Sequence, residues 1–355
     1  MKYVLLVVII GLFHGIALTQ AQNTKMLPDK PGKFILKNQL DKCPGIDIAS
    51  FSKNLTAVAE WIHLNNTVLN PPVGFDASVS FSGNSCEKIT DKRVFGIQCR
   101  INFSFHYFYI ENGKFLTATD WAAHDIEINI NSPISQIGHQ YDETEFQSGD
   151  PPRLKQPMEK AIENLRQYYN SAPVEKEIAP GVRLYAGGHL LVFNPDQPDI
   201  WIPVTVREIM EAKQAYYKVK QEIDSIKYEK ALVEWAKLNF KPDKVNSPDV
   251  YDLVKKEFEN FTADELTQPA FSDSQSGIST INAHGEGMPV VRFNPASWNR
   301  ALPSTAVQFM SMEYNPRTKT EMEDFKHDNG GLIDYVGLFA KNLQVDKIGI
   351  LIHGK

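Results

Sequence analysis

The first part of the chain carries one helical pattern followed by three strand-like patterns. Between residues 46 and 65, apolar residues recur every three or four positions, which predicts an amphipathic helix. Three later runs are rich in β-branched and aromatic residues, at 74–82, 94–111 and 114–131. Such runs are typical of strands, and Asn112-Gly113 between the last two is typical of a tight hairpin turn. A helix followed by an antiparallel meander predicts an α+β module over residues 47–145.

This predicted order of elements is similar in outline to cystatin-like and nuclear-transport-factor-2-like layouts, in which a helix packs across a curled sheet. The inhibitor signature Gln-x-Val-x-Gly does not occur in the chain. The resemblance therefore concerns the layout of the module and implies no activity.

A longer helical pattern occupies the second half of the chain. Thr205 and Glu208 have the spacing of a capping box, which satisfies backbone N–H groups at a helix start. Apolar residues then recur at helical spacing, and a second stripe follows after a slip at Tyr228, Leu232, Trp235 and Leu238. Ser247-Pro248 has the residue types of another helix start. We expect a helical hairpin over about 205–261 that packs on its own domain.

Polar residues with prolines and glycines separate the two halves near residues 146–155. We expect a polar lead segment over 22–46, the α+β antiparallel-sheet module over 47–145, and a mixed α/β domain over 156–355. The fold class predicted for the whole chain is therefore α+β.

The last third of the chain mixes an irregular stretch with short apolar runs. Residues 262–288 have many serines and glycines and little periodicity, which predicts a mobile loop. The apolar run 348–352 predicts a buried strand at the C-terminal end.

The N-terminus has the pattern of a secretory signal peptide over residues 1–21. Met1-Lys2 supplies a positive start, an apolar run follows, and Thr19 and Ala21 place small residues at −3 and −1 before Gln22. The run is short for a membrane span, and nothing later resembles one. We expect a secreted, soluble protein of the periplasm or the extracellular space, without a transmembrane segment after cleavage.

Composition excludes some partners. Apolar content of 42% and charged content of 23% are typical of a globular protein. The net charge of −6 argues against nucleic acid, which rewards a basic surface.

Cysteine usage leaves the disulfide pattern open. The chain has three cysteines, Cys43, Cys86 and Cys99. Cys86 and Cys99 flank a loop between strand-like runs and are the candidate pair, and buried thiols without any bond are the alternative. Neither CxxC nor HExxH occurs, so no metal site is predicted.

No compact catalytic motif is present. The chain lacks Gly-x-Ser-x-Gly, a phosphate-binding loop and a dinucleotide fingerprint, so no cofactor is predicted. The favoured hypothesis is a non-enzymatic exported protein that binds a partner protein or a glycan. The alternative is a cell-surface or periplasmic hydrolase with Asp/Glu chemistry, because dispersed carboxylate pairs leave no sequence signature.

Four residues are candidate ligand-binding groups. Trp201 and Trp298 lie in segments bordered by Pro and Asn, where an exposed indole ring stacks on a sugar or anchors a partner. His284 and Glu286 are the titratable groups that the predicted loop 262–288 would carry to a ligand. Other tryptophans, such as Trp61, fall on periodic faces and are predicted core residues.

Overall fold

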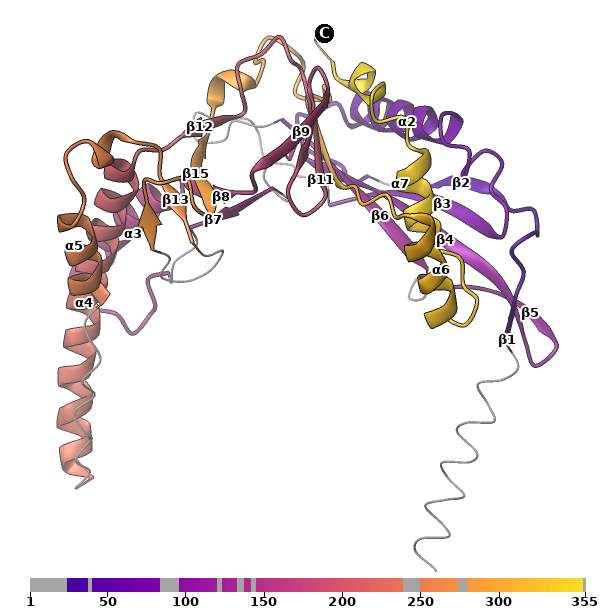
Figure 1. The fold of residues 1–355 in the computed structure, drawn as a ribbon. Coiled ribbons are helices and arrows are strands. Elements are labelled where there is room, and N and C mark those ends of the chain that lie inside the picture. The colour runs from indigo at the N-terminus through magenta and orange to yellow at the C-terminus, as the bar shows by residue number, and fades with distance from the viewer. Residues whose placement is uncertain are drawn as a thin grey trace, which may run out of the picture.

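The computed structural model describes residues 24–37, 40–83, 96–119, 123–132, 137–141, 145–238, 250–273 and 280–353. It contains helices together with mainly antiparallel sheets, so the α+β class is confirmed. Figure 1 shows two sheets that follow one another across the molecule, with a long helix at one end. Within the described residues, no helix has both the length and the apolar character needed to cross a membrane.

The larger sheet has ten strands, six from residues 24–130 and four from residues 174–313. Its main path runs β2 (Phe34–Lys37), β3 (Phe75–Ser82), β4 (Cys99–Glu111), β6 (His124–Ile130), β16 (Phe309–Glu313), β11 (His189–Phe193), β10 (Val182–Tyr185) and β9 (Val174–Ala179). Two further strands pair with β4, namely β1 (Thr24–Met26) and β5 (Lys114–Thr117). The pairing of β2 with β3 is parallel, and the pairings from β3 onward along the path are antiparallel.

The smaller sheet has six strands. Its path runs β14 (Ile281–Asn282), β13 (Phe271–Ser272), β15 (Met288–Phe293), β8 (Tyr168–Ser171) and β7 (Gly138–Gln140), and β12 (Trp201–Pro203) pairs with β15. The helices are α2 (Ile48–Leu64), α3 (Lys155–Leu165), α4 (Val206–Lys237), α5 (Val250–Glu259), α6 (Lys319–Asp328) and α7 (Tyr335–Asn342). Short 3₁₀ turns are η1 (Pro152–Leu154), η2 (Glu265–Thr267), η3 (Pro295–Ser297) and η4 (Ile348–Leu351).

Several local predictions are confirmed. Glu111 pairs with Lys114 across the turn, and Asn112 and Gly113 have the positive φ angles that a tight hairpin requires. Alternation along β6 buries Ile126, Ile128 and Ile130 on one face, where α2 and α7 also contribute to the core. At the start of α4, Thr205 and Glu208 form the predicted capping box.

The first module is completed by residues from the other end of the chain. Strand β16 pairs with the free edge of β6, and Phe339 of α7 packs in the same core as Phe103 of β4. Without β16, the edge of β6 would leave a row of backbone N–H and C=O groups unpaired. The sheet therefore continues beyond the predicted module 47–145, with strands from later in the chain. The predicted C-terminal strand at 348–352 is wrong, because residues 348–351 form η4.

The stretch 262–288 is more structured than its composition suggests. It contains η2, β13 and β14, and the side chains of Ala270, Ser272 and Ile281 are buried. Ala270 exchanges backbone hydrogen bonds with Val204 and Val290, which fixes this part of the chain between two neighbouring segments. Residues 274–279 lie outside the described residues, and the mobility of the stretch stays a prediction.

The predicted Cys86–Cys99 disulfide is wrong. Cys99 is a free thiol, buried on β4, and Cys43 is disulfide-bonded. Burial raises the pKa of the Cys99 thiol to about 11, so the reactive thiolate is scarce at neutral pH. Cys99 points toward the packed side of the sheet together with Ile101 and Phe103, and it behaves there as a small apolar residue. Cys86 lies outside the described residues.

Candidate interaction surface on a projecting helix

The first half of α4 is built into the second core. The capping box at Thr205 fixes its start, and buried apolar side chains follow at helical spacing, among them Ile209, Met210, Tyr216 and Ile223. These residues pack with α3, α5 and the smaller sheet. Ile223 is the last buried residue of the helix, although the helix continues to Lys237.

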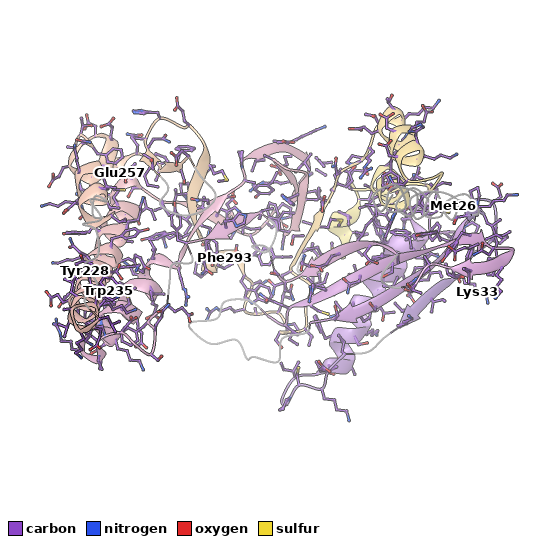
Figure 2. All side chains as sticks on the ribbon, turned by 90° about the horizontal axis from the view of Figure 1, so that it is seen from below. Met26, Lys33, Tyr228, Trp235, Glu257 and Phe293 are labelled. Atoms are coloured by element: carbon purple, nitrogen blue, oxygen red, sulfur yellow. The ribbon has the colours of Figure 1, made fainter. Side chains whose placement is uncertain are left out.

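Polar contacts hold the same part of the helix from two sides. Lys213 is 2% exposed, and its Nζ lies 3.7 Å from a carboxylate oxygen of Glu257 on α5. The other carboxylate oxygen of Glu257 accepts a hydrogen bond of 2.6 Å from the backbone N–H of Ile281. Glu257, labelled in Figure 2, therefore connects α4, α5 and β14.

Further along, Lys227 forms an ion pair with the buried Asp150, and Glu222 forms one of 2.6 Å with Arg153. These pairs attach the helix to the segment that leads into α3. Beyond Lys227, the ion pairs of α4 with described residues lie within the helix itself, as with Glu234 and Lys237 at 2.6 Å. Among the described residues, the ion pairs that attach α4 to its neighbours thus end about ten residues before the helix does.

The last part of α4 carries a row of apolar side chains, several of which are exposed. Tyr228 is 46% exposed and Leu238, the C-cap residue, is 76% exposed. Leu232 is also exposed, and the rings of Tyr228 and Trp235 meet edge to face at 6.3 Å. We define the distal stripe as Tyr228, Leu232, Trp235 and Leu238. Figure 1 shows this end of α4 extending beyond the rest of the molecule, and Figure 2 labels both aromatic residues on it.

Helical geometry places the distal stripe in line with the side of α4 that faces α5. Tyr217 is buried, and because each residue advances the helix by about 100°, Tyr228 lies within about 20° of it around the helix axis. Tyr228 also lines a groove with Val250 and Tyr251 of α5. The spacing of Tyr228, Leu232 and Trp235 then keeps these three side chains on one face.

The polar sides of the distal part carry no net charge. Residues 224–238 contain three acidic and three basic side chains, namely Asp224, Glu229, Glu234, Lys227, Lys230 and Lys237. The chain as a whole has a net charge of −6. The distinguishing property of this surface is therefore its exposed apolar area.

The structure places the two candidate tryptophans in one apolar cluster. Trp298 is 3% exposed and its ring lies 5.7 Å from that of Phe309, a position that favours a packing role. Trp201 packs against the same cluster and is partly exposed, with its ring 5.7 Å from Tyr169 and 6.5 Å from Phe293.

His284 and Glu286 lie in the exposed turn between β14 and β15. The side-chain oxygen of Asn282 accepts hydrogen bonds from both of their backbone N–H groups, and the His284 ring lies 3.8 Å from Glu265. This turn precedes β15, whereas Trp201 pairs with Phe293 at the other end of that strand. The structure therefore does not bring His284 and Glu286 to the two tryptophans.

Sequence reasoning missed a buried polar pair on the outer face of the larger sheet. Ser78 Oγ lies 2.8 Å from His106 Nε2, and His106 Nδ1 lies 3.0 Å from the carbonyl oxygen of Ala118. A carbonyl oxygen only accepts, so Nδ1 carries the proton and Ser78 donates to Nε2. Both side chains are buried between strands, and this position favours a structural role. No spacing rule could have found the pair, because it depends on the register of β3 and β4.

Neither metal-binding residues nor similarity to known proteins assigns a function to these surfaces. In the part of the chain that the structure describes, no group of three or more His, Cys, Asp or Glu side chains could hold a metal ion. Comparison with protein-family models, with curated proteins and with solved structures found no match.

Proposed function

We propose that this protein is an exported, non-enzymatic binding protein whose distal stripe docks into an apolar groove of a partner protein. The observation that carries the proposal is the exposure of Tyr228, Leu232 and Leu238 on the last part of α4. Soluble proteins rarely expose contiguous apolar surface, and such surface commonly marks an interaction site. Anchors at positions i, i+4 and i+7 are the pattern by which a helix is recognised in a groove.

A groove accounts for this surface better than pairing with a second copy. The distal part spans only about two heptads, and a free coiled coil needs at least three. Two helices touching along one narrow stripe would bury less than the roughly 1,200 Å² of a stable interface. A groove encloses the helix on several sides and buries more surface for each residue. The balanced charges of the polar sides give no attraction to nucleic acid or to an anionic membrane.

Photo-crosslinking in the cells that produce the protein tests the docking site. We expect a photoreactive amino acid in place of Leu232 to give a discrete adduct with another protein, because Leu232 lies in the middle of the distal stripe. The matched control replaces Lys230, which helical geometry places about 160° away on the same part of α4. The readout is the mass of the adducts and the identity of their peptides.

Equal adducts from both positions, or none from either, would contradict the docking site. An adduct of twice the mass of the chain would replace the grooved partner with a second copy. The substitution Leu238→Ser should leave the free energy of unfolding within about 0.5 kcal/mol of wild type, because this side chain is exposed in the folded chain. Its effect on adduct formation would therefore report on binding rather than on folding.

Export is the second part of the proposal, and the N-terminal pattern supports it. We expect the mature chain to begin at Gln22 and to be found in the periplasm or the culture fluid. N-terminal sequencing and the intact mass of the protein from that fraction measure this directly. A chain that retains residues 1–21 in the cytoplasm would contradict export and leave the docking site to be judged by crosslinking alone. The disulfide at Cys43 agrees with an oxidising compartment.

A further inference from the structure

A groove on the half of the molecule away from α4 is formed by three segments that are far apart in the sequence. The C-terminal end of α2, the turn between β9 and β10, and the segment before and within η4 line an open groove of about 520 Å³. Figure 1 shows α2 and the C-terminal end of the chain together on this half of the molecule. The volume lies within the range of about 300–1,000 Å³ that is usual for small-molecule sites.

One wall of the groove is apolar and firmly held. Trp61 is partly buried, packs against the core beneath the larger sheet and also lines the groove. Pro180 lies on the same wall. Ile350 of η4 lines the groove as well and is 72% exposed, although the residues on either side of it, Gly349 and Leu351, are more deeply buried. A flat indole ring on a rigid support and an exposed aliphatic side chain suit a ligand that has an apolar face.

The rim of the groove offers both hydrogen-bond acceptors and donors. The Asn65 side-chain nitrogen donates to the Trp61 carbonyl oxygen at 2.8 Å, which holds the amide in place and leaves its oxygen available as an acceptor. The Gln344 side-chain oxygen accepts from Lys347 Nζ at 3.0 Å, which leaves its NH₂ group available as a donor. Asp346 adds an exposed carboxylate as a further acceptor.

The charges of the rim cancel. Asp346 and Lys347 are the charged residues that line the cavity, with one charge of each sign. A phosphate or sulfate would face the Asp346 carboxylate, and a cation would face the Lys347 ammonium group. The balance therefore favours a neutral ligand with many hydrogen-bonding groups.

We propose that this groove binds a short neutral oligosaccharide. The C–H face of a sugar ring would pack on Trp61, and its hydroxyl groups, which donate and accept, would bond the Asn65 oxygen, the Gln344 NH₂ group and the Asp346 carboxylate. The site shares no residue with the distal stripe and does not depend on the partner protein proposed above.

Saturation-transfer NMR on the full mature chain tests the site with a panel of neutral trisaccharides of glucose, galactose, mannose and N-acetylglucosamine. We expect at least one of them to bind, with saturation on the C–H face of one ring. Titration calorimetry should then show about a tenfold weaker affinity for Asp346→Ala, since a hydrogen bond to a charged group contributes about 1.5–3 kcal/mol. Asp346→Asn, which keeps an acceptor oxygen, should lose less.

Trp61→Ala removes the platform but also a core contact, so Trp61→Phe is the second variant at this position. Phenylalanine should keep the fold and part of the affinity. Leu238→Ser, on the distal stripe, should bind the saccharide as wild type does. The inference is overturned if no neutral trisaccharide binds at millimolar concentration, if Asp346→Ala binds as tightly as wild type, or if only sulfated saccharides bind.

Discussion

Replacing Glu257 with glutamine is expected to lower the free energy of unfolding by about 3 kcal/mol. Lys213 is almost fully buried, and Glu257 supplies the carboxylate 3.7 Å from its ammonium group. Breaking a buried ion pair by removing one member costs about 3–5 kcal/mol. Because Glu257 itself is partly exposed, the lower end of that range is expected. Urea unfolding, followed by circular dichroism, measures the change.

The matched variants separate the charge from the hydrogen bond. Glutamine at position 257 retains an oxygen that accepts from the Ile281 N–H, whereas alanine loses that contact too and should cost about 1 kcal/mol more. Lys213→Met removes the buried charge, so the double variant with Glu257→Gln should recover most of the lost stability. If Lys213→Met does not restore the free energy of unfolding that Glu257→Gln loses, the ion pair is not the contact that attaches α5 to α4.

Local elements of this chain could be predicted because their signals lie within a few residues. The turn at Asn112-Gly113 needs two positive φ angles, which these residue types tolerate, and the capping box at Thr205 needs only a spacing of three. The alternation of isoleucines along β6 indicates which face is buried without reference to any partner strand. Each of these features is independent of the rest of the fold.

Long-range pairing carries no such local signal. The sequence could not show that β16 lies beside β6, because any strand with a suitable face could occupy that edge. The run 348–352 is apolar and short, and periodicity does not distinguish a strand from a helical turn at that length. The structure forms η4 there, with Ile348 buried and Ile350 exposed.

Each candidate site also has a part that the sequence predicts and a part that depends on the tertiary fold. The slip from Ile226 to Tyr228 is visible in the sequence, but whether the domain extends far enough to cover the second stripe is a property of the tertiary fold. Trp61 lies on a periodic helical face, and this position predicts a core residue. In the structure its side chain packs against the core and also lines the groove. The β9–β10 turn and the C-terminal segment form the rest of the groove, and no local pattern predicts that they lie beside α2.

The second large effect is expected at Asn131, where β6 ends. Asn131 is fully buried and has a φ of +57°. Its side-chain nitrogen donates to the carbonyl oxygens of Ile97 and Ala306, each at 2.9 Å, and its oxygen accepts from the N–H groups of Gln308 and Phe309 at 2.8 and 3.4 Å. One amide thus joins the end of β6, the segment that leads into β4 and the segment that leads into β16.

Asn131→Ala should therefore lower the free energy of unfolding by about 4 kcal/mol, because it leaves buried backbone groups unpaired and forces a positive φ on a residue with a Cβ atom. Asn131→Gly tolerates the φ angle but makes none of the four bonds. If the hydrogen bonds dominate, glycine recovers only about 1 kcal/mol of the loss, the cost of the left-handed conformation for alanine. Equilibrium unfolding of the two variants beside wild type measures this difference. Full recovery by glycine would show that backbone conformation alone selects Asn131, and the attachment of β16 to β6 would then depend on the strand pairing and the core rather than on this amide.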